Sequence, residues 1–148
     1  MELLTFKLDN VLYGIDLNSA IEIVPLPYIT KFGNLPSYIC GIIDLRGRTV
    51  PIIDLKARIG TGKSRFELDN NVIIVSFQNK KIGLIVDTVV SLEKINEFDF
   101  IPPPTMLEGV DISFMKAAVN TPEGLLISLS LEHILRVEDV AAADKNYI

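Results

Sequence analysis

The residues most able to do chemistry form a glycine-rich stretch, Ala57-Arg58-Ile59-Gly60-Thr61-Gly62-Lys63-Ser64. It departs from the phosphate-binding pattern Gly-x4-Gly-Lys-Ser only at Ala57, which replaces the first glycine. In a working phosphate loop a long helix follows the serine, and the N-terminus of that helix receives the phosphates. The residues at 65–71 are too few and too rich in turn formers for such a helix. The loop at 60–64 is therefore interpreted as a connector, and a phosphate- or nucleotide-binding protein is the alternative function.

The other reactive side chains are too isolated for a catalytic or metal centre. His133 and Cys40 are the only residues of their types, so no cluster of imidazoles or thiolates could hold a metal. Asp16, Asp54 and Asp87 each end or follow an apolar strand. Aspartate at such positions commonly accepts hydrogen bonds from backbone amides, which we favour over acid–base catalysis. The sequence thus predicts a protein that is not an enzyme, with no catalytic residue, metal or cofactor.

Composition restricts the partners further. The 148 residues carry a formal net charge of −5, whereas binding nucleic acid needs a clustered basic surface, so nucleic acid is not expected as a partner. One local basic group, Lys56, Arg58, Lys63 and Arg65, is interpreted as a solvated loop. No apolar run reaches the roughly 18 to 20 residues of a membrane helix, and no signal-peptide pattern is present. The 49% of hydrophobic residues should therefore form a core and an exposed docking patch in a cytoplasmic protein that does not insert into membranes.

Alternation of apolar and polar residues, which is typical of strands, dominates the chain, and the two halves of the chain share one repeated pattern. When Gly14 is placed over Gly83, the flanking apolar positions coincide, and in the later hairpins 52–55 coincides with 128–131. Each half has about five short strands, and a sheet that small removes its exposed edges by closing into a barrel. We therefore predict an all-β fold of two small five-stranded SH3-like β-barrels packed together, with a short C-terminal helix.

The whole chain, 1–148, is expected to form a single domain. In this prediction the first barrel takes about 12–65 plus the terminal strand, and the second barrel takes about 70–138. The polar, glycine-bearing stretch around 60–71 would cross between the barrels, and 141–148 would be a tail.

The segment 41–55 predicts a hairpin with an arginine at its tip. Apolar runs flank the turn, and proline in the second arm suits an edge strand or a strand start. The segment resembles the signature of the CheW-like domain, in which Gly, two aliphatics and Asn-Leu-Arg-Gly precede Pro, two aliphatics and Asp-Leu. The chain departs from it at Asp44, where the family commonly has Asn, and at Ser130, where Asp is usual. The matching residues are Gly41, Leu45, Arg46, Gly47, Pro51, Asp54 and Leu55.

The resemblance covers roughly residues 2 to 138 and implies a function. It implies a non-catalytic chemotaxis adaptor that couples chemoreceptors to a CheA-type histidine kinase within membrane receptor arrays. The partners would be the regulatory domain of the kinase and the cytoplasmic tip of methyl-accepting chemoreceptors, whose helical hairpin lies along the groove between the barrels. From the residues alone, Arg46 could equally be a turn residue that satisfies turn carbonyls. By matching position, the expected receptor-binding residues are Glu22, Arg46, Val72, Gly83 and Val89, and the expected kinase-binding residues are Ala20 and Gly41.

Overall fold

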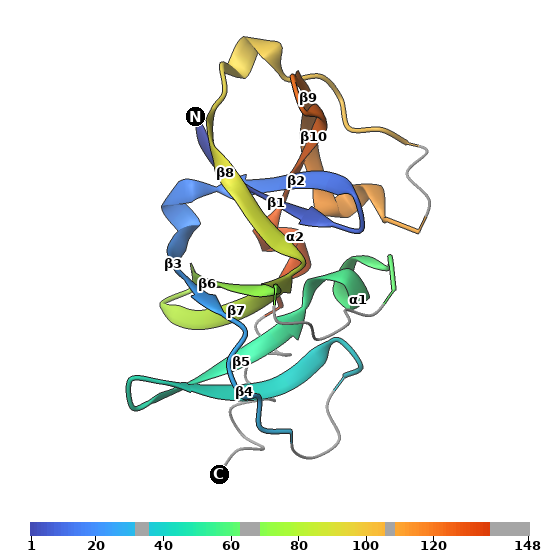
Figure 1. The fold of residues 1–148 in the computed structure, drawn as a ribbon. Helices are drawn as coiled ribbons and strands as arrows, with labels where there is room; N and C mark the ends of the chain where they lie inside the picture. The colour runs from blue at the N-terminus through green and yellow to red at the C-terminus, as the bar shows by residue number, and fades with distance from the viewer. Residues whose placement is uncertain (32–35, 63–68, 106–108, 137–148) are drawn as a thin grey trace.

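The computed structural model describes residues 1–31, 36–62, 69–105 and 109–136 (Figure 1). Two short α-helices, α1 (Leu55–Ile59) and α2 (Leu131–Ile134), and three 3-10 turns, Leu17–Ser19, Glu97–Asp99 and Ile112–Phe114, accompany the strands. Within the described ranges, no helix has the length and apolar character that crossing a membrane requires. The strands are β1 (Glu2–Leu8), β2 (Val11–Asp16), β3 (Ala20–Pro25), β4 (Ile39–Leu45), β5 (Arg48–Asp54), β6 (Asn71–Phe77), β7 (Lys80–Val86), β8 (Thr88–Lys94), β9 (Met115–Thr121) and β10 (Gly124–Leu129).

These strands form two sheets of five strands each. The β2 sheet has the order β8-β1-β2-β10-β9, and the β7 sheet has the order β3-β6-β7-β5-β4. Figure 1 shows the β2 sheet above the β7 sheet, with α2 at the level between them and α1 beside the β7 sheet. All neighbouring strands are antiparallel except β10 with β2 and β5 with β7. The predicted all-β class is confirmed, α2 is the expected C-terminal helix, and closure of each sheet into a barrel stays a prediction.

The internal repeat is visible in the pairing register. In the two parallel ladders, Ser128 lies opposite Gly14 and Ile52 lies opposite Gly83. The two pairs correspond, because the sequence repeat aligns Gly14 with Gly83 and Ile52 with Ser128. The ladders β1–β8 and β3–β6 each carry an irregularity at the matching point. The two halves of the chain therefore repeat not only in sequence but in strand order and in strand distortion.

Each sheet nevertheless combines strands from both halves. The first hairpin, β1–β2, pairs with strands of the second half, and the equivalent hairpin β6–β7 pairs with strands of the first half. The expected assignment of 12–65 to one barrel and 70–138 to the other does not match this topology. Instead the β7 sheet takes the continuous stretch 20–86, and the β2 sheet takes the strands on either side of it. The reason is that β5 pairs in parallel with β7, which places the β6–β7 hairpin of the second half beside the β4–β5 hairpin of the first half. Parallel strands need a crossover between them, and α1 lies in this one.

The core has a layer inside each sheet and a larger layer shared by both. Along β6, Val72 and Ile74 pack in a cluster of the β7 sheet, while Ile73 and Val75 pack in the shared cluster. This division follows from the two-residue period of a strand, which points successive side chains to opposite faces. Both faces of β6 are thus buried, and its four central residues have no exposed surface.

Helix α1 fastens the sheets together through two basic side chains. Lys56 Nζ lies 2.8 Å from Asp9 Oδ1 and 2.9 Å from Asp87 Oδ1, and its side chain is only 9% exposed. Arg58 donates from Nε to the carbonyl of Ile134 at 2.7 Å. Its guanidinium also lies 5.0 Å from the ring centres of two aromatic side chains, Tyr38 and Phe114. The solvated-loop interpretation is wrong for Lys56 and Arg58, and the other two residues of that basic group lie outside the described ranges.

Candidate functional site

The site lies where an edge strand of one sheet approaches an edge strand of the other. Strand β3 is the edge of the β7 sheet, and β8 is the edge of the β2 sheet. Between them runs a groove with a volume of ≈ 300 Å³. Its lining residues come from both strands and from the chain beside them: Leu4, Leu17, Ala20, Ile21, Glu22, Ile23, Val89, Ser91 and Leu92.

Large apolar side chains remain exposed on both walls of this groove. Ile21 and Ile23 on β3 are 46% and 44% exposed, and Leu92 on β8 is 57% exposed. Edge strands of soluble proteins are usually protected by charges or prolines because they present free backbone groups. Contiguous apolar surface at such a position is typical of a docking site for another protein. The groove is therefore the strongest candidate for an interaction surface in the described part of the chain.

An exposed ion pair holds the tip of the β4–β5 hairpin beside the groove. Arg46, in the turn with φ 51°, reaches Glu22 on β3 through both arms of its guanidinium, and the Nη1–Oε2 distance is 3.3 Å. The hydrogen bond from Arg46 lowers the pKa of Glu22, and the same bond raises the pKa of Arg46. Asp44 supports the turn by accepting a hydrogen bond from the Gly47 amide at 3.0 Å. Asp44 thus performs a turn-closing role at the position where the family commonly has Asn.

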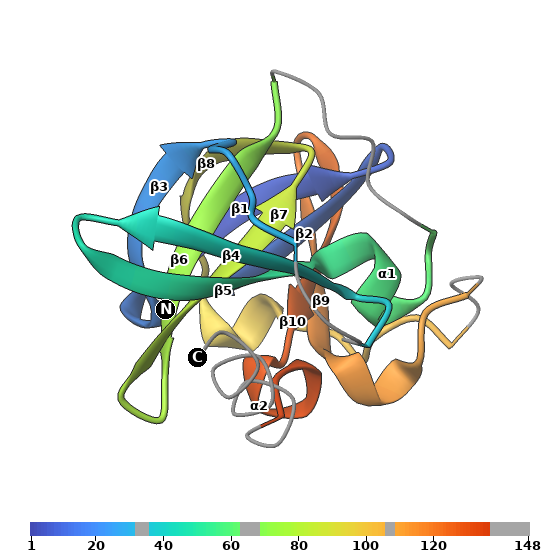
Figure 2. The same cartoon turned by 90° about the horizontal axis from the view of Figure 1, so that it is seen from below.

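The structure brings several of the expected partner-binding residues to one place. Ala20, Glu22 and Val89 line the groove together, and Arg46 joins them through its bond to Glu22. The hairpin that carries Arg46 projects beyond the rest of its sheet in both views (Figures 1 and 2). A residue expected at the kinase contact, Ala20, therefore lies next to residues expected at the receptor contact.

The remaining three expected residues lie in the interior. Val72 has no exposed surface, and Gly83 is buried so tightly that a Cβ there would lie 2.8 Å from Val72 Cγ1. Gly41 is also buried, and its Cβ would overlap the backbone of Thr30. Direct contact with a partner does not fit these positions. Any part they take in binding acts through the packing of the strands that carry the exposed groups.

The exposed walls of the groove were not identified from the sequence. Ile21, Ile23 and Leu92 become a site only because β3 and β8 are edges that face one another. The available signal was that apolar residues occupy both phases of the alternation in β3, so that one phase had to remain outside the core.

The aspartates that end or follow strands, and the histidine, lie at turns and helix ends. Asp16 accepts from the amide of Asn18 at 2.9 Å, and Asp87 accepts from the amide of Asp9 at 2.7 Å, as interpreted from the sequence. Asp54 occupies the N-cap position of α1 but makes no side-chain hydrogen bond to the helix end. His133 lies in α2, where its Nδ1 is 2.7 Å from the hydroxyl of the same helix's N-cap serine. Within the described residues, no group of three or more His, Cys, Asp or Glu could hold a metal.

Two further features bear on chemistry. Burial raises the pKa of the Cys40 thiol to about 12, so its reactive thiolate form is disfavoured at neutral pH. In the glycine-rich loop, Gly60 ends α1 in a left-handed conformation with φ 97°. The helix there precedes the glycines, opposite to the order in a phosphate loop. Lys63 and Ser64, on which the phosphate-loop pattern depends, lie outside the described residues.

Comparison with known proteins shows which family this chain resembles. The family model of the CheW-like domain matches residues 2–139. The chain is 29% identical over 143 residues to a chemotaxis protein CheW of Klebsiella aerogenes, covering 97% of this chain and 86% of that protein. It is 27% identical to a chemotaxis protein CheW of Treponema pallidum, covering 94% of this chain and 84% of that protein.

A solved structure agrees with the same assignment. The crystal structure of the scaffolding protein TtCheW from Thermoanaerobacter tengcongensis has a TM-score of 0.82 and 36% sequence identity, covering 93% of this chain and 89% of that chain. The strand order, the hairpin signature at 41–55 and the matched length all lead to one conclusion. The chain belongs to the family of CheW-like domains.

Proposed function

We propose that this protein is a non-catalytic chemotaxis adaptor that couples chemoreceptors to a CheA-type histidine kinase. The observation that carries the proposal is the apolar groove between β3 and β8, with Ile21, Ile23 and Leu92 exposed along its walls. A groove of this kind suits the apolar face of a helix, so the helical tip of a methyl-accepting chemoreceptor is its proposed occupant. Glu22 and Arg46 add directional polar contacts at the rim.

The second proposed partner is the regulatory domain of the kinase. This assignment rests on the family relationship, since the relatives are named chemotaxis and scaffolding proteins. Such a protein acts by differential contacts that shift the populations of kinase states, and it needs no chemistry of its own. The proposed location is the cytoplasm, beside membrane receptor arrays.

Placing a charge in the groove tests the receptor contact. We expect Leu92→Glu to weaken binding to a purified chemoreceptor tip fragment by about thirtyfold, because a carboxylate would have to be desolvated against the apolar face of the helix. The melting temperature should change little, because Leu92 is 57% exposed in the unbound protein. Isothermal titration calorimetry and thermal unfolding on the same preparation separate the two effects.

Leu125→Glu is the matched control for this change. Leu125 is also an exposed leucine on a strand of the β2 sheet, at 38%, but it does not line the groove. Its variant should bind the receptor fragment as the unchanged protein does. Equal affinities for the Leu92 variant, the Leu125 variant and the unchanged protein would mean that the receptor helix does not occupy this groove.

Breaking the rim ion pair tests the role of Arg46. We expect Arg46→Ala to lower receptor affinity by about tenfold with little change in the melting temperature, since the turn is exposed and truncation opens no cavity. Kinase binding should persist. A double variant, Glu22→Arg with Arg46→Glu, should recover part of the affinity if the pair works by holding the hairpin tip. A large drop in the melting temperature of Arg46→Ala would instead show that the arginine is chiefly structural.

The rim pair also has a defined pH range. The pKa of Glu22 is lowered in the folded protein from its ordinary value of 4.5, so the pair is fully present above that pH. Its contribution is lost only as the pH falls through the lowered pKa. Receptor affinity should therefore not depend on this pair's protonation at neutral pH.

A further inference from the structure

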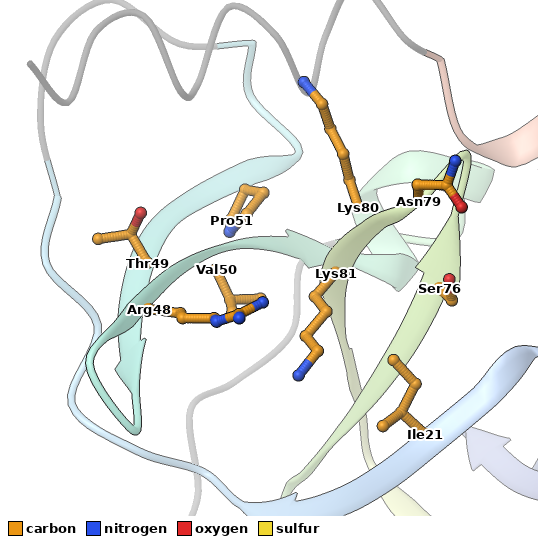
Figure 3. Close-up of a pocket in the computed structure, with 9 residues that line it drawn as sticks. All are labelled: Ile21, Arg48, Thr49, Val50, Pro51, Ser76, Asn79, Lys80 and Lys81. Atoms are coloured by element: carbon orange, nitrogen blue, oxygen red, sulfur yellow. The ribbon is translucent and has the colours of Figure 1, made fainter.

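A second hollow adjoins the groove and is lined by basic residues. It lies on the β7 sheet, has a volume of ≈ 390 Å³, and shares Ile21 with the groove (Figure 3). Arg48 enters it from β5 and Lys81 from β7, while Lys80 extends away from Lys81 (Figure 3). Consecutive residues of a strand point to opposite faces, so the ammonium group of Lys80 is directed away from that of Lys81, although Lys80 also lines the hollow. The hollow therefore presents one guanidinium and one ammonium group beside an apolar groove.

No carboxylate lines this hollow among the described residues. Neither Arg48 nor Lys81 forms an ion pair within the described residues, although Lys81 is near enough to Glu22 for its charge to help lower the pKa of that carboxyl group. By contrast, Arg46 and Lys56 are both paired with carboxylates. The chain as a whole carries a net charge of −5, so a hollow lined by basic side chains and by no carboxylate differs in charge from the average of its surface. Such a pocket attracts a complementary acidic group and contributes more to specificity and association rate than to bulk affinity.

We propose that this hollow binds carboxylates on the flank of the same helical partner that occupies the groove. The inference rests on the function proposed above, because it takes the groove occupant to be a helix. A helix is about 10 Å across, so one seated between β3 and β8 would extend over Ile21 towards Lys81 and Arg48. The partner is then a helix with an apolar stripe for the groove and acidic residues along the side that faces β6 and β7. The pocket selects which receptor helices fit and in which orientation.

Charge reversal tests this pocket. We would titrate the full-length protein with a purified chemoreceptor tip fragment by calorimetry, at about 50 mM and about 300 mM NaCl. Arg48→Glu and Lys81→Glu should each weaken binding by about tenfold at low salt, and the loss should shrink at high salt because exposed charges are screened. Lys116→Glu is the control, since this exposed lysine of β9 lines neither the groove nor the hollow. It should change the affinity by less than about twofold.

The outcomes separate this inference from the function beneath it. If Leu92→Glu abolishes binding and both pocket variants bind normally, the pocket proposal is overturned and the groove proposal stands. If none of these variants changes receptor binding, both proposals fail. Loss of kinase binding with unchanged receptor binding in the pocket variants would also overturn the inference. Should Lys81→Glu fail to fold, Arg48→Glu decides the question, because Arg48 is exposed.

Discussion

Replacing Gly41 by alanine should lower the melting temperature by about 10 °C. Gly41 has φ 144°, which side chains other than glycine rarely adopt, and its Cβ would lie 2.9 Å from the carbonyl carbon of Thr30 and still closer to the oxygen. The neighbouring bridge, in which Thr30 and Ile42 exchange hydrogen bonds of 2.8 and 3.0 Å, would have to open. Backbone strain and two lost hydrogen bonds together amount to about 3 to 5 kcal/mol. Each kcal/mol shifts the melting temperature of a chain of this size by about 2 to 4 °C.

Gly62→Ala is the matched control for this prediction. Gly62 also has a positive φ, of 129°, but among the described residues no atom outside its immediate neighbours lies within 4 Å of a Cβ built there. The difference between the two variants therefore reports the steric conflict of a Gly41 side chain with Thr30 and Ile29. A melting temperature for Gly41→Ala no lower than that of Gly62→Ala would contradict the close approach of these two backbones.

The Gly41 result also bears on the kinase contact. Gly41 is buried, so a loss of kinase binding in Gly41→Ala can arise from displacement of the chain around Thr30 and not from a missing contact. Measuring kinase binding well below the melting temperature of the variant distinguishes a local rearrangement from simple unfolding.

Removing the Lys56 side chain should have the second-largest effect on stability. We expect Lys56→Ala to lower the free energy of unfolding by about 2 to 3 kcal/mol, because the Lys56 side chain is only 9% exposed and its ammonium group binds both Asp9 and Asp87. The expected value lies below that for a fully buried pair, since the two aspartates are 60% and 28% exposed and can be rehydrated. Urea unfolding at neutral pH measures it.

Two comparisons identify the origin of this loss. Lys56→Met keeps the apolar stem and should lose less than the alanine variant, so the difference between them reports packing. Burial opposes the charged form of Lys56, but the hydrogen bonds to Asp9 and Asp87 outweigh it and raise its pKa above 10.5. The charge-dependent part of the stability is therefore complete below pH 10.5 and lost as the pH rises through the raised pKa. An advantage of the unchanged protein over Lys56→Met that persists undiminished at pH 12 would show that the ion pairs do not supply it.

Local features of the fold were predictable because they depend on residues close in sequence. The hairpin at 41–55 follows from apolar runs around a glycine turn, and the observed β4–β5 pair has Leu45 opposite Arg48. The repeat was also predictable, since matching apolar positions impose matching strands. What the repeat could not reveal is which copy of a hairpin joins which sheet. Both arrangements bury the same side chains, and the choice depends on how the connections cross.

The site was predictable only in part for a similar reason. Apolar residue type does not say which face of a strand a side chain occupies, so Val72 and Gly83 were expected at a groove but pack inside a sheet. Glu22 and Arg46 form a pair across 24 residues, and Lys56 meets Asp9 across 47. Charge patterning along the chain cannot identify such partners, which is why the sequence predicts a solvated loop around a lysine that in fact links the two sheets.

Each sheet pairs a hairpin of one half of the chain with strands of the other half, and this arrangement imposes an order on folding during synthesis. All strands of the β7 sheet lie between Ala20 and Val86, so they leave the ribosome before β9 and β10 exist. The β2 sheet instead joins the first strands made to the last, and the side chains of Thr5 and Ser91 that bond across it are 86 residues apart. Non-local pairing is slow, and chains fold from the N-terminus as they emerge. The β1–β2 hairpin is therefore the segment that keeps unpaired edges and apolar side chains exposed longest, and it is where a nascent chain is most vulnerable to mispairing.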